Sequence, residues 1–318
     1  MHSVSFTAKP IYLITLVATM LLLPVVVLAA SDQDREMSPD EIATELSNPV
    51  TALRFIGNEI EYRTYAGSLP ESADQNGLVY RFEPSFPFKL KNGKNLLIRA
   101  SIPLNLEEPE WRVDVDHPIF EVDRDYTEFL LRQSPQVTPD SGHFRTVHGH
   151  LSDITFDVAY GDVNDRGFIS MYGIAGVLPS SQNISGAREQ LLLGPEIALG
   201  KMADWGVIGI WAKQLIDVNG DESFNTNETS IDLFFAYGLG HGWQIISNPS
   251  ILYDWEADSG NELLLSLGGG IAKTLQIGSI PVKMELEIYN YVVTPDRFGR
   301  EWLMTFKITP VISSLFQN

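Results

Sequence analysis

Apolar and polar residues alternate with a period of two along much of this chain, most clearly in its last segment. From Trp302 to Phe316 nearly every even position is apolar or aromatic, whereas Thr305, Lys307 and Thr309 occupy odd positions between them. A period of two predicts a β-strand with one apolar face. A final strand with a Phe near the chain end is typical of outer-membrane barrels, whose outer face must be apolar.

Twelve segments of strand length follow one another along the chain, and several of them alternate cleanly. Their ranges are 50–66, 77–90, 95–106, 151–162, 167–178, 190–201, 205–216, 229–239, 242–255, 261–275, 280–292 and 301–316. The connections are alternately long and short, and Asn92-Gly93 in one short connection is a strong signal for a tight hairpin. Short inner turns, longer outer loops and an even strand number are the rule for membrane barrels. The pattern therefore predicts an all-β fold, a transmembrane antiparallel up-and-down β-barrel of about 12 strands.

Four tryptophans, Trp205, Trp243, Trp255 and Trp302, lie close to the ends of these segments. Aromatic residues form girdles at both interfaces of a membrane barrel. Ordinary packing at the ends of a soluble sandwich would give the same positions, so tryptophan placement supports the barrel only together with the other signals.

The N-terminal region predicts export. Residues 1–30 read as a secretory signal peptide, with Lys9, an apolar core over 11–28, and Ala29 and Ala30 as small residues at a cleavage site. An uncleaved anchor is the alternative. Residues 31–49 are expected to form a periplasmic N-terminal segment. A capping box of Ser38 and Glu41 predicts a short helix in it, with a plain linker as the alternative. Residues 50–318 form the predicted barrel, with a long outer loop at 107–150.

The amino-acid composition excludes several classes of function and of membrane attachment. The chain has 41 acidic and 22 basic residues, and this net charge of −19 argues against nucleic-acid binding. It has no cysteine, which excludes a lipid-modified N-terminus and disulfides. After residue 30 no apolar run reaches the roughly 18–20 residues of a spanning helix, so any embedding of the mature chain in a membrane must be by strands. The predicted location is the Gram-negative outer membrane.

The sequence also resembles a known family. The pieces that carry the resemblance are ELSNPV (45–50), GHLSDITFDVAY (149–160), VLPSS (177–181), GPEIALGK (194–201), NPSILYDW (248–255) and GREW (299–302). They resemble, in order, a family of outer-membrane transporters linked to meta-pathway phenol degradation, whose members are often labelled neuromedin U in bacterial genomes. The resemblance covers most of the mature chain and departs from the family in the long acidic second outer loop. It implies a twelve-stranded barrel that transports small, hydrophobic or aromatic compounds.

The polar faces of the predicted strands nominate a set of residues that would line the lumen. They are Arg81, Glu83, Arg99, Asp153, Asp157, Glu196, Lys213, Asp232, Asn248, Lys283, Glu285, Glu287 and Lys307. Such a wall would set the selectivity of a pore. Alternatively these charges pair across a closed interior, because twelve strands lie between filled barrels and open porins.

Three further features suggest binding. Asp217, Asn219, Asp221 and Glu228 occupy positions 1, 3, 5 and 12 of a calcium-loop pattern, but Glu222 replaces its glycine, so a polar hairpin loop is the main alternative. A histidine cluster, His143, His148 and His150, has spacing that would allow a metal, but it reads more simply as a solvated loop. The acidic stretch 107–128 would be a solvated loop, a surface bridged to lipopolysaccharide by divalent ions, or an inward-folding plug.

The sequence holds no Gly-x-Ser-x-Gly elbow and no phosphate-binding loop, so we expect neither enzymatic activity nor a cofactor. The predicted function is an outer-membrane channel for small solutes. A closed structural or surface-binding barrel is the alternative, followed by an outer-membrane enzyme. Expected partners are outer-membrane lipid, lipopolysaccharide, the small-molecule solute, and the barrel-assembly machinery through the C-terminal strand.

Overall fold

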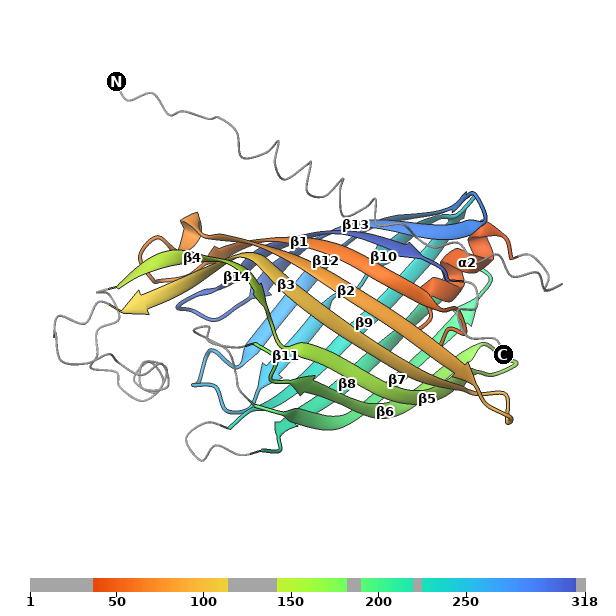
Figure 1. Ribbon diagram of the computed structural model, residues 1–318, viewed down its shortest axis with the longest axis horizontal. Helices are drawn as coiled ribbons and strands as arrows, with labels where there is room; N and C mark the ends of the chain where they lie inside the picture. Colours follow the sequence, from red (N-terminus) through yellow and green to blue (C-terminus); the bar gives the residue numbers. More distant parts are fainter. Residues whose placement is uncertain (1–36, 114–141, 182–189, 220–224, 313–318) are drawn as a thin grey trace, which may run out of the picture. The chain divides into compact units, whose positions relative to one another are not determined.

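One antiparallel sheet closes on itself in the computed structural model, which describes residues 37–113, 142–181, 190–219 and 225–312. The first and last strands pair along nine positions, from Asn58 opposite Ile308 to Ala66 opposite Gly299. The strands are β1 (Phe55–Ala66), β2 (Asn76–Lys89), β3 (Asn95–Val113), β4 (Gly142–Leu151), β5 (Ile154–Val163), β6 (Phe168–Leu178), β7 (Leu192–Ala203), β8 (Gly206–Asp217), β9 (Asn227–Gly240), β10 (Trp243–Ser247), β11 (Ser250–Asp254), β12 (Leu263–Ile277), β13 (Ile280–Val293) and β14 (Gly299–Pro310). Figure 1 shows them tilted around a common axis.

Fourteen strand segments make twelve barrel strands, because two strands are interrupted. β4 and β5 both pair with β3, and the break between them falls at Ser152 and Asp153. β10 and β11 both pair with β9 and β12, and are separated by Asn248-Pro249. Proline lacks the N–H that a ladder needs, which accounts for the second break. The closed twelve-stranded antiparallel barrel predicted from the sequence is confirmed.

Three sequence-based boundaries were wrong. β1 begins at Phe55 rather than at residue 50, because the preceding residues turn into the barrel mouth. The predicted loop 107–150 is strand at both ends, since β3 continues to Val113 and β4 starts at Gly142. Glu107, Glu108 and Glu110 lie on the part of β3 that pairs with β4, and the acidic residues from 114 to 128 lie outside the described residues. The last strand ends at Pro310, and residues 313–318, including Phe316, lie outside the described residues.

The outer surface of the barrel is an apolar belt. Large hydrophobic side chains point outward at alternate positions of its strands, among them Tyr172, Ile174, Leu267, Leu286 and Ile288, each about half exposed. All four tryptophans nominated from the sequence are exposed as well. Water would not favour so much exposed apolar surface, whereas lipid requires it. The belt therefore identifies a membrane-spanning wall. Among the described residues, no helix is long and apolar enough to span a bilayer.

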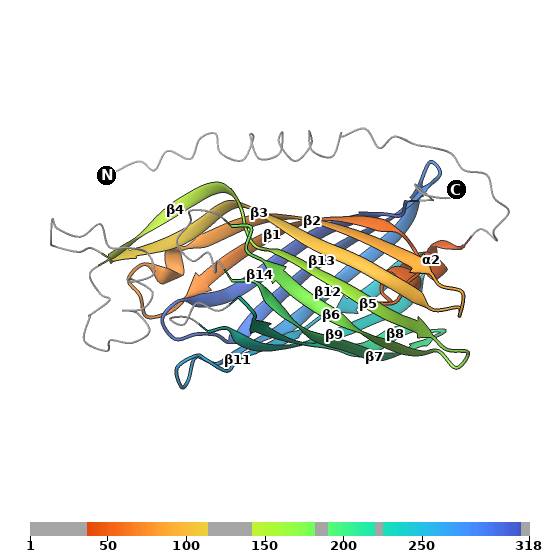
Figure 2. The ribbon, with the colours of Figure 1, turned by 60° about the horizontal axis from the view of Figure 1, so that its bottom comes forward.

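Helix α2 (Pro39–Leu46) lies at the end of the barrel that carries the short turns (Figures 1 and 2). Its first turn is capped by Ser38, which accepts a hydrogen bond from the Glu41 N–H, while the Glu41 carboxylate accepts one from the Ser38 N–H. This is the capping box that the sequence predicts.

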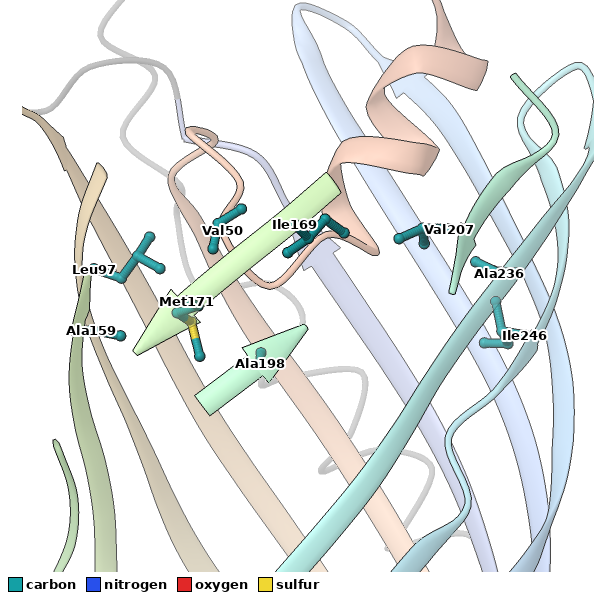
Figure 3. Close-up of a cluster of buried hydrophobic side chains, with 10 residues drawn as sticks. Val50, Leu97, Ala159, Ile169, Met171, Ala198, Val207, Ala236 and Ile246 are labelled. Carbon is teal, nitrogen blue, oxygen red and sulfur yellow. The ribbon is translucent and has the colours of Figure 1, made fainter. Parts of the chain in front are cut away.

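The main buried apolar cluster lies at the same end, inside the barrel. It consists of Val50 and inward-facing residues of six or more strands: Leu97, Ala159, Ile169, Met171, Ala198, Val207, Ala236, Ile246 and Ala272. Figure 3 shows Val50, on the turn that follows α2, pointing toward Leu97 and Met171. The described residues that precede β1 are therefore packed into the barrel.

At the opposite end the β3–β4 hairpin projects and is held by aromatic contacts (Figure 2). Trp111 meets Phe144 at 4.8 Å between ring centroids, Phe144 meets Phe298 at 4.8 Å, and Phe298 stacks on Tyr65 at 4.7 Å. The aromatic row ties the hairpin to the β13–β14 connection and to β1.

Candidate functional site: the barrel lumen

The barrel encloses a cavity of about 740 Å³. Eleven of the thirteen residues nominated from the sequence line it: Arg81, Glu83, Arg99, Asp157, Lys213, Asp232, Asn248, Lys283, Glu285, Glu287 and Lys307. They reach it from strands around the whole barrel, because alternate positions of every strand point inward.

The other two nominated residues lie away from the cavity wall. Asp153 sits in the break between β4 and β5, where its carboxylate accepts hydrogen bonds from the Ser181 N–H at 3.0 Å and the Ser181 hydroxyl at 2.5 Å. Glu196 is buried behind Trp211, whose indole N–H donates to it at 2.9 Å. Asp153 supports a turn, and Glu196 positions an aromatic ring.

One side of the lumen carries a row of opposite charges. The strand register places Glu285 opposite Lys307, Lys307 opposite Glu59, and Glu59 opposite Arg81. The charges on four neighbouring strands therefore alternate in sign. Lys307 contacts Glu83, and lies 3.6 Å from Glu59. Opposite charges on adjacent strands stabilise the sheet and keep the wall hydrated.

Glu61 on β1 is the centre of a second ionic group on this side. Its carboxylate accepts hydrogen bonds from Arg63 and from Arg81. The side chains of Glu61 and Arg63 are both more than nine-tenths buried. A buried carboxylate needs such partners, because an unpaired one would be costly.

The other side of the lumen is aromatic. Trp211 on β8 and Phe234 on β9 both border the cavity. Gly209 makes room for Phe234, since a Cβ at this glycine would lie 2.3 Å from Phe234 Cζ. Lys213 Nζ lies 4.2 Å from the centroid of the Trp211 ring, a cation–π distance.

Arg99 reaches across this half of the barrel. It pairs with Asp157 at 2.7 Å, and its guanidinium carbon lies 4.3 Å from the centroid of the Trp211 ring. It also donates a hydrogen bond to the Pro49 carbonyl at 2.9 Å. One side chain thus joins two walls and the N-terminal segment.

Glu287 is held by neutral donors. The Asn248 amide donates to its carboxylate at 2.9 Å, and the Tyr289 hydroxyl donates to the same oxygen. The Asn248 N–H in turn donates to the Tyr289 hydroxyl at 2.8 Å. No cation lies within 4 Å of Glu287 among the described residues, which leaves negative charge facing the lumen.

Sequence reasoning missed several wall residues. Glu59 and Glu61, with Arg63 buried beside Glu61, were overlooked because β1 carries polar residues on both faces, although three charges at alternate positions were a usable signal. Trp211 was missed because both faces of β8 are largely apolar. Nothing in the sequence places residues 46–49 in the lumen.

The described residues contain no group of three or more His, Asp or Glu side chains that could hold a metal ion. Asp217 accepts hydrogen bonds from Gln190 and from the Asn219 N–H, while Asn219 accepts one from the Leu191 N–H. Glu228 is on β9, and Asp221 falls outside the described residues. The calcium loop therefore remains a prediction.

The three histidines lie on β4 and do not converge. His143 and His148 are five positions apart, so they point to opposite faces of the strand. His150 lies 2.9 Å from Glu108, and its ring also contacts Asn105.

Comparisons with known proteins support the fold. No family model and no curated protein matches the sequence. The COG4313 outer membrane channel from Pseudomonas putida F1 has a similar structure, with a TM-score of 0.53, 8% sequence identity, and coverage of 90% of this chain and 100% of that one. At this identity the likeness shows a shared barrel fold and nothing more. The family resemblance read from the sequence remains a prediction.

Two further solved structures are less similar. Outer membrane phospholipase A from Escherichia coli gives a TM-score of 0.40 at 11% identity, covering 88% of this chain and 100% of that chain. The CymD monoaromatic hydrocarbon channel gives 0.37 at 10% identity, covering 92% and 96%. Neither says what this chain does.

The expectation that the chain is not an enzyme needs correction. Structures of outer membrane phospholipase A, including an active-site mutant, are among the barrels similar to this one. The absence of one nucleophile motif from the sequence does not exclude other enzymatic chemistry.

Proposed function

We propose that this protein is an outer-membrane channel for the passage of small solutes. The observation that carries the proposal is a charged and aromatic cavity of about 740 Å³ inside a barrel whose outer wall is apolar. A barrel serving only as a scaffold gains nothing from burying so many ionisable groups, since each must be paired or hydrated. A pore wall needs them to keep water and solute in the lumen.

The short turns and α2 would face the periplasm, and the β3–β4 hairpin would face outward, following the loop-length rule for such barrels. In this orientation residues 31–49 belong to the periplasmic end of the barrel, where residues 46–49 enter its mouth, and residues 1–30 are a cleaved signal peptide. Glu107 and Glu108 on the hairpin, whose side chains are partly exposed, would meet lipopolysaccharide. The C-terminal strand would be recognised by the assembly machinery.

The solute class we propose is small hydrophobic or aromatic compounds. Trp211 and Phe234 give the cavity one aromatic wall opposite the row of charges. A ring could stack on this wall while its polar substituent remains hydrated on the charged side. The resemblance in the sequence points to the same class.

The test is a swelling assay on liposomes that contain the refolded protein. Small polar solutes that cross lipid slowly, such as arabinose and zwitterionic phenylalanine, should enter faster than into liposomes without protein, whereas a trisaccharide should be excluded. Equal rates with and without inserted, folded protein, both for the mature chain and for a variant lacking residues 37–51, would refute a channel and favour a closed barrel.

A further inference from the structure

The short-turn mouth of the barrel is occupied by residues 39–51 of the same chain. Val50 is 1% exposed and belongs to the buried apolar cluster (Figure 3). Its carbonyl accepts a hydrogen bond from the Asn95 side chain at 2.9 Å, and the neighbouring Pro49 carbonyl accepts one from Arg99. This stretch therefore lies inside the mouth and forms the floor of the cavity.

The helix is held to the rim by a second group of contacts. Asp40 accepts hydrogen bonds from the backbone N–H groups of His241 and Gly242, at 3.1 and 2.5 Å. Ser47 accepts one from Lys283 at 2.9 Å and donates one to Gln244 at 3.4 Å. Gly242 has a φ of +77°, so the β9–β10 turn needs a glycine to aim its N–H at the helix.

The fit between segment and barrel is incomplete. The Gln244 Nε2 and the hydroxyls of Thr274 and Thr309 are buried without a hydrogen-bond partner in the described structure. Gln244 contacts the segment directly, and Thr309 lines the cavity that the segment closes. Withdrawal of the segment would let water reach these groups and hydrogen-bond with them.

We propose that residues 39–51 are a plug that closes the short-turn mouth and withdraws to open the lumen. The proposal rests on the proposed channel function. In the described structure the plug is held by side-chain hydrogen bonds and by the buried Ile42, Ala43 and Val50, with no strand pairing to the wall, so it can leave while the closed ladder of the barrel stays intact. Arg99 and Lys283 are its positioning residues within the lumen.

The first experiment locks the plug in place. The natural chain has no cysteine, so Ser47→Cys with Gln244→Cys provides one unique pair, which a short bismaleimide can join. The double variant should give discrete channel openings in a planar bilayer before cross-linking and none afterwards. Ser47→Cys alone, treated with the same reagent, is the matched control and should still open. Unchanged open probability after complete cross-linking would overturn the proposal.

The second experiment removes the plug. A variant lacking residues 37–51, shown to be folded by heat-modifiability on a gel, should remain open. Silence of this folded variant would overturn both the plug and the channel. Equal currents in the wild-type, deleted and cross-linked proteins would overturn the plug alone and leave the channel standing.

The third experiment weakens one anchor without touching the lumen. Asp40→Ala removes two hydrogen bonds to the rim and should raise open probability about five- to tenfold, the effect of about one such bond. Asp204→Ala, an exposed acid in the β7–β8 turn at the same end, is the control and should change nothing. A matching increase in both variants would contradict specific anchoring by Asp40.

Discussion

At the scale of single residues, the lumen wall carries more negative than positive charge. The lining includes seven acidic side chains and five basic ones. Most are neutralised by neighbours, as in Glu61 with Arg63 and Arg81. Glu287 differs because its hydrogen-bond donors are Asn248 and Tyr289, which are neutral. The excess charge predicts a lumen that favours cations moderately.

Reversing the negative charge of the lumen lining should reverse the preference of the channel for cations. The double variant Glu285→Lys, Glu287→Lys changes the net charge of the lining from −2 to +2, by counting its acidic and basic residues. We expect the reversal potential in a tenfold KCl gradient to change sign, from the value of a cation-selective channel to that of an anion-selective one. Asp165→Lys, on an exposed turn, should leave it in place. An unmoved potential in the double variant would show that the ion path avoids these residues.

At the scale of elements, the sequence predicted what is periodic and missed what is not. The alternation in β13, with Met284, Leu286 and Ile288 against Lys283 and Glu285, is enough to locate the strand and its two faces. The interruption at Asn248-Pro249 and the continuation of β3 past Glu107 depend on pairing with distant strands, which a local pattern does not contain.

The depth of an outward-facing residue in the apolar belt predicts how much a charged substitution there destabilises the barrel. Leu286 is 55% exposed near the middle of β13, at the centre of the apolar belt. Leu286→Arg should lower the free energy of unfolding by about 2–4 kcal/mol, because an arginine at the bilayer midplane is costly. Leu239→Arg, close to the end of β9, should cost about 0–1 kcal/mol. Urea titrations in lipid vesicles measure both, and equal losses would contradict the assigned depth of the belt.

At the scale of the whole molecule, the closed sheet and the cavity inside it form only when all the strands pair with one another. Eleven of the thirteen nominated residues line one cavity, because alternate residues of each strand face the lumen. The plug was not predictable, since a capping box at Ser38 fixes a helix but not where it docks. Its place is set by contacts such as Arg99 with the Pro49 carbonyl, fifty residues apart in the chain.

The most direct test of the account is single-channel conductance of the refolded mature protein in a planar bilayer. A charged lumen that passes solute predicts discrete steps whose size rises with salt concentration. A silent bilayer would contradict the channel, provided that the protein is shown to be inserted and folded, and that the variant lacking residues 37–51 is silent as well.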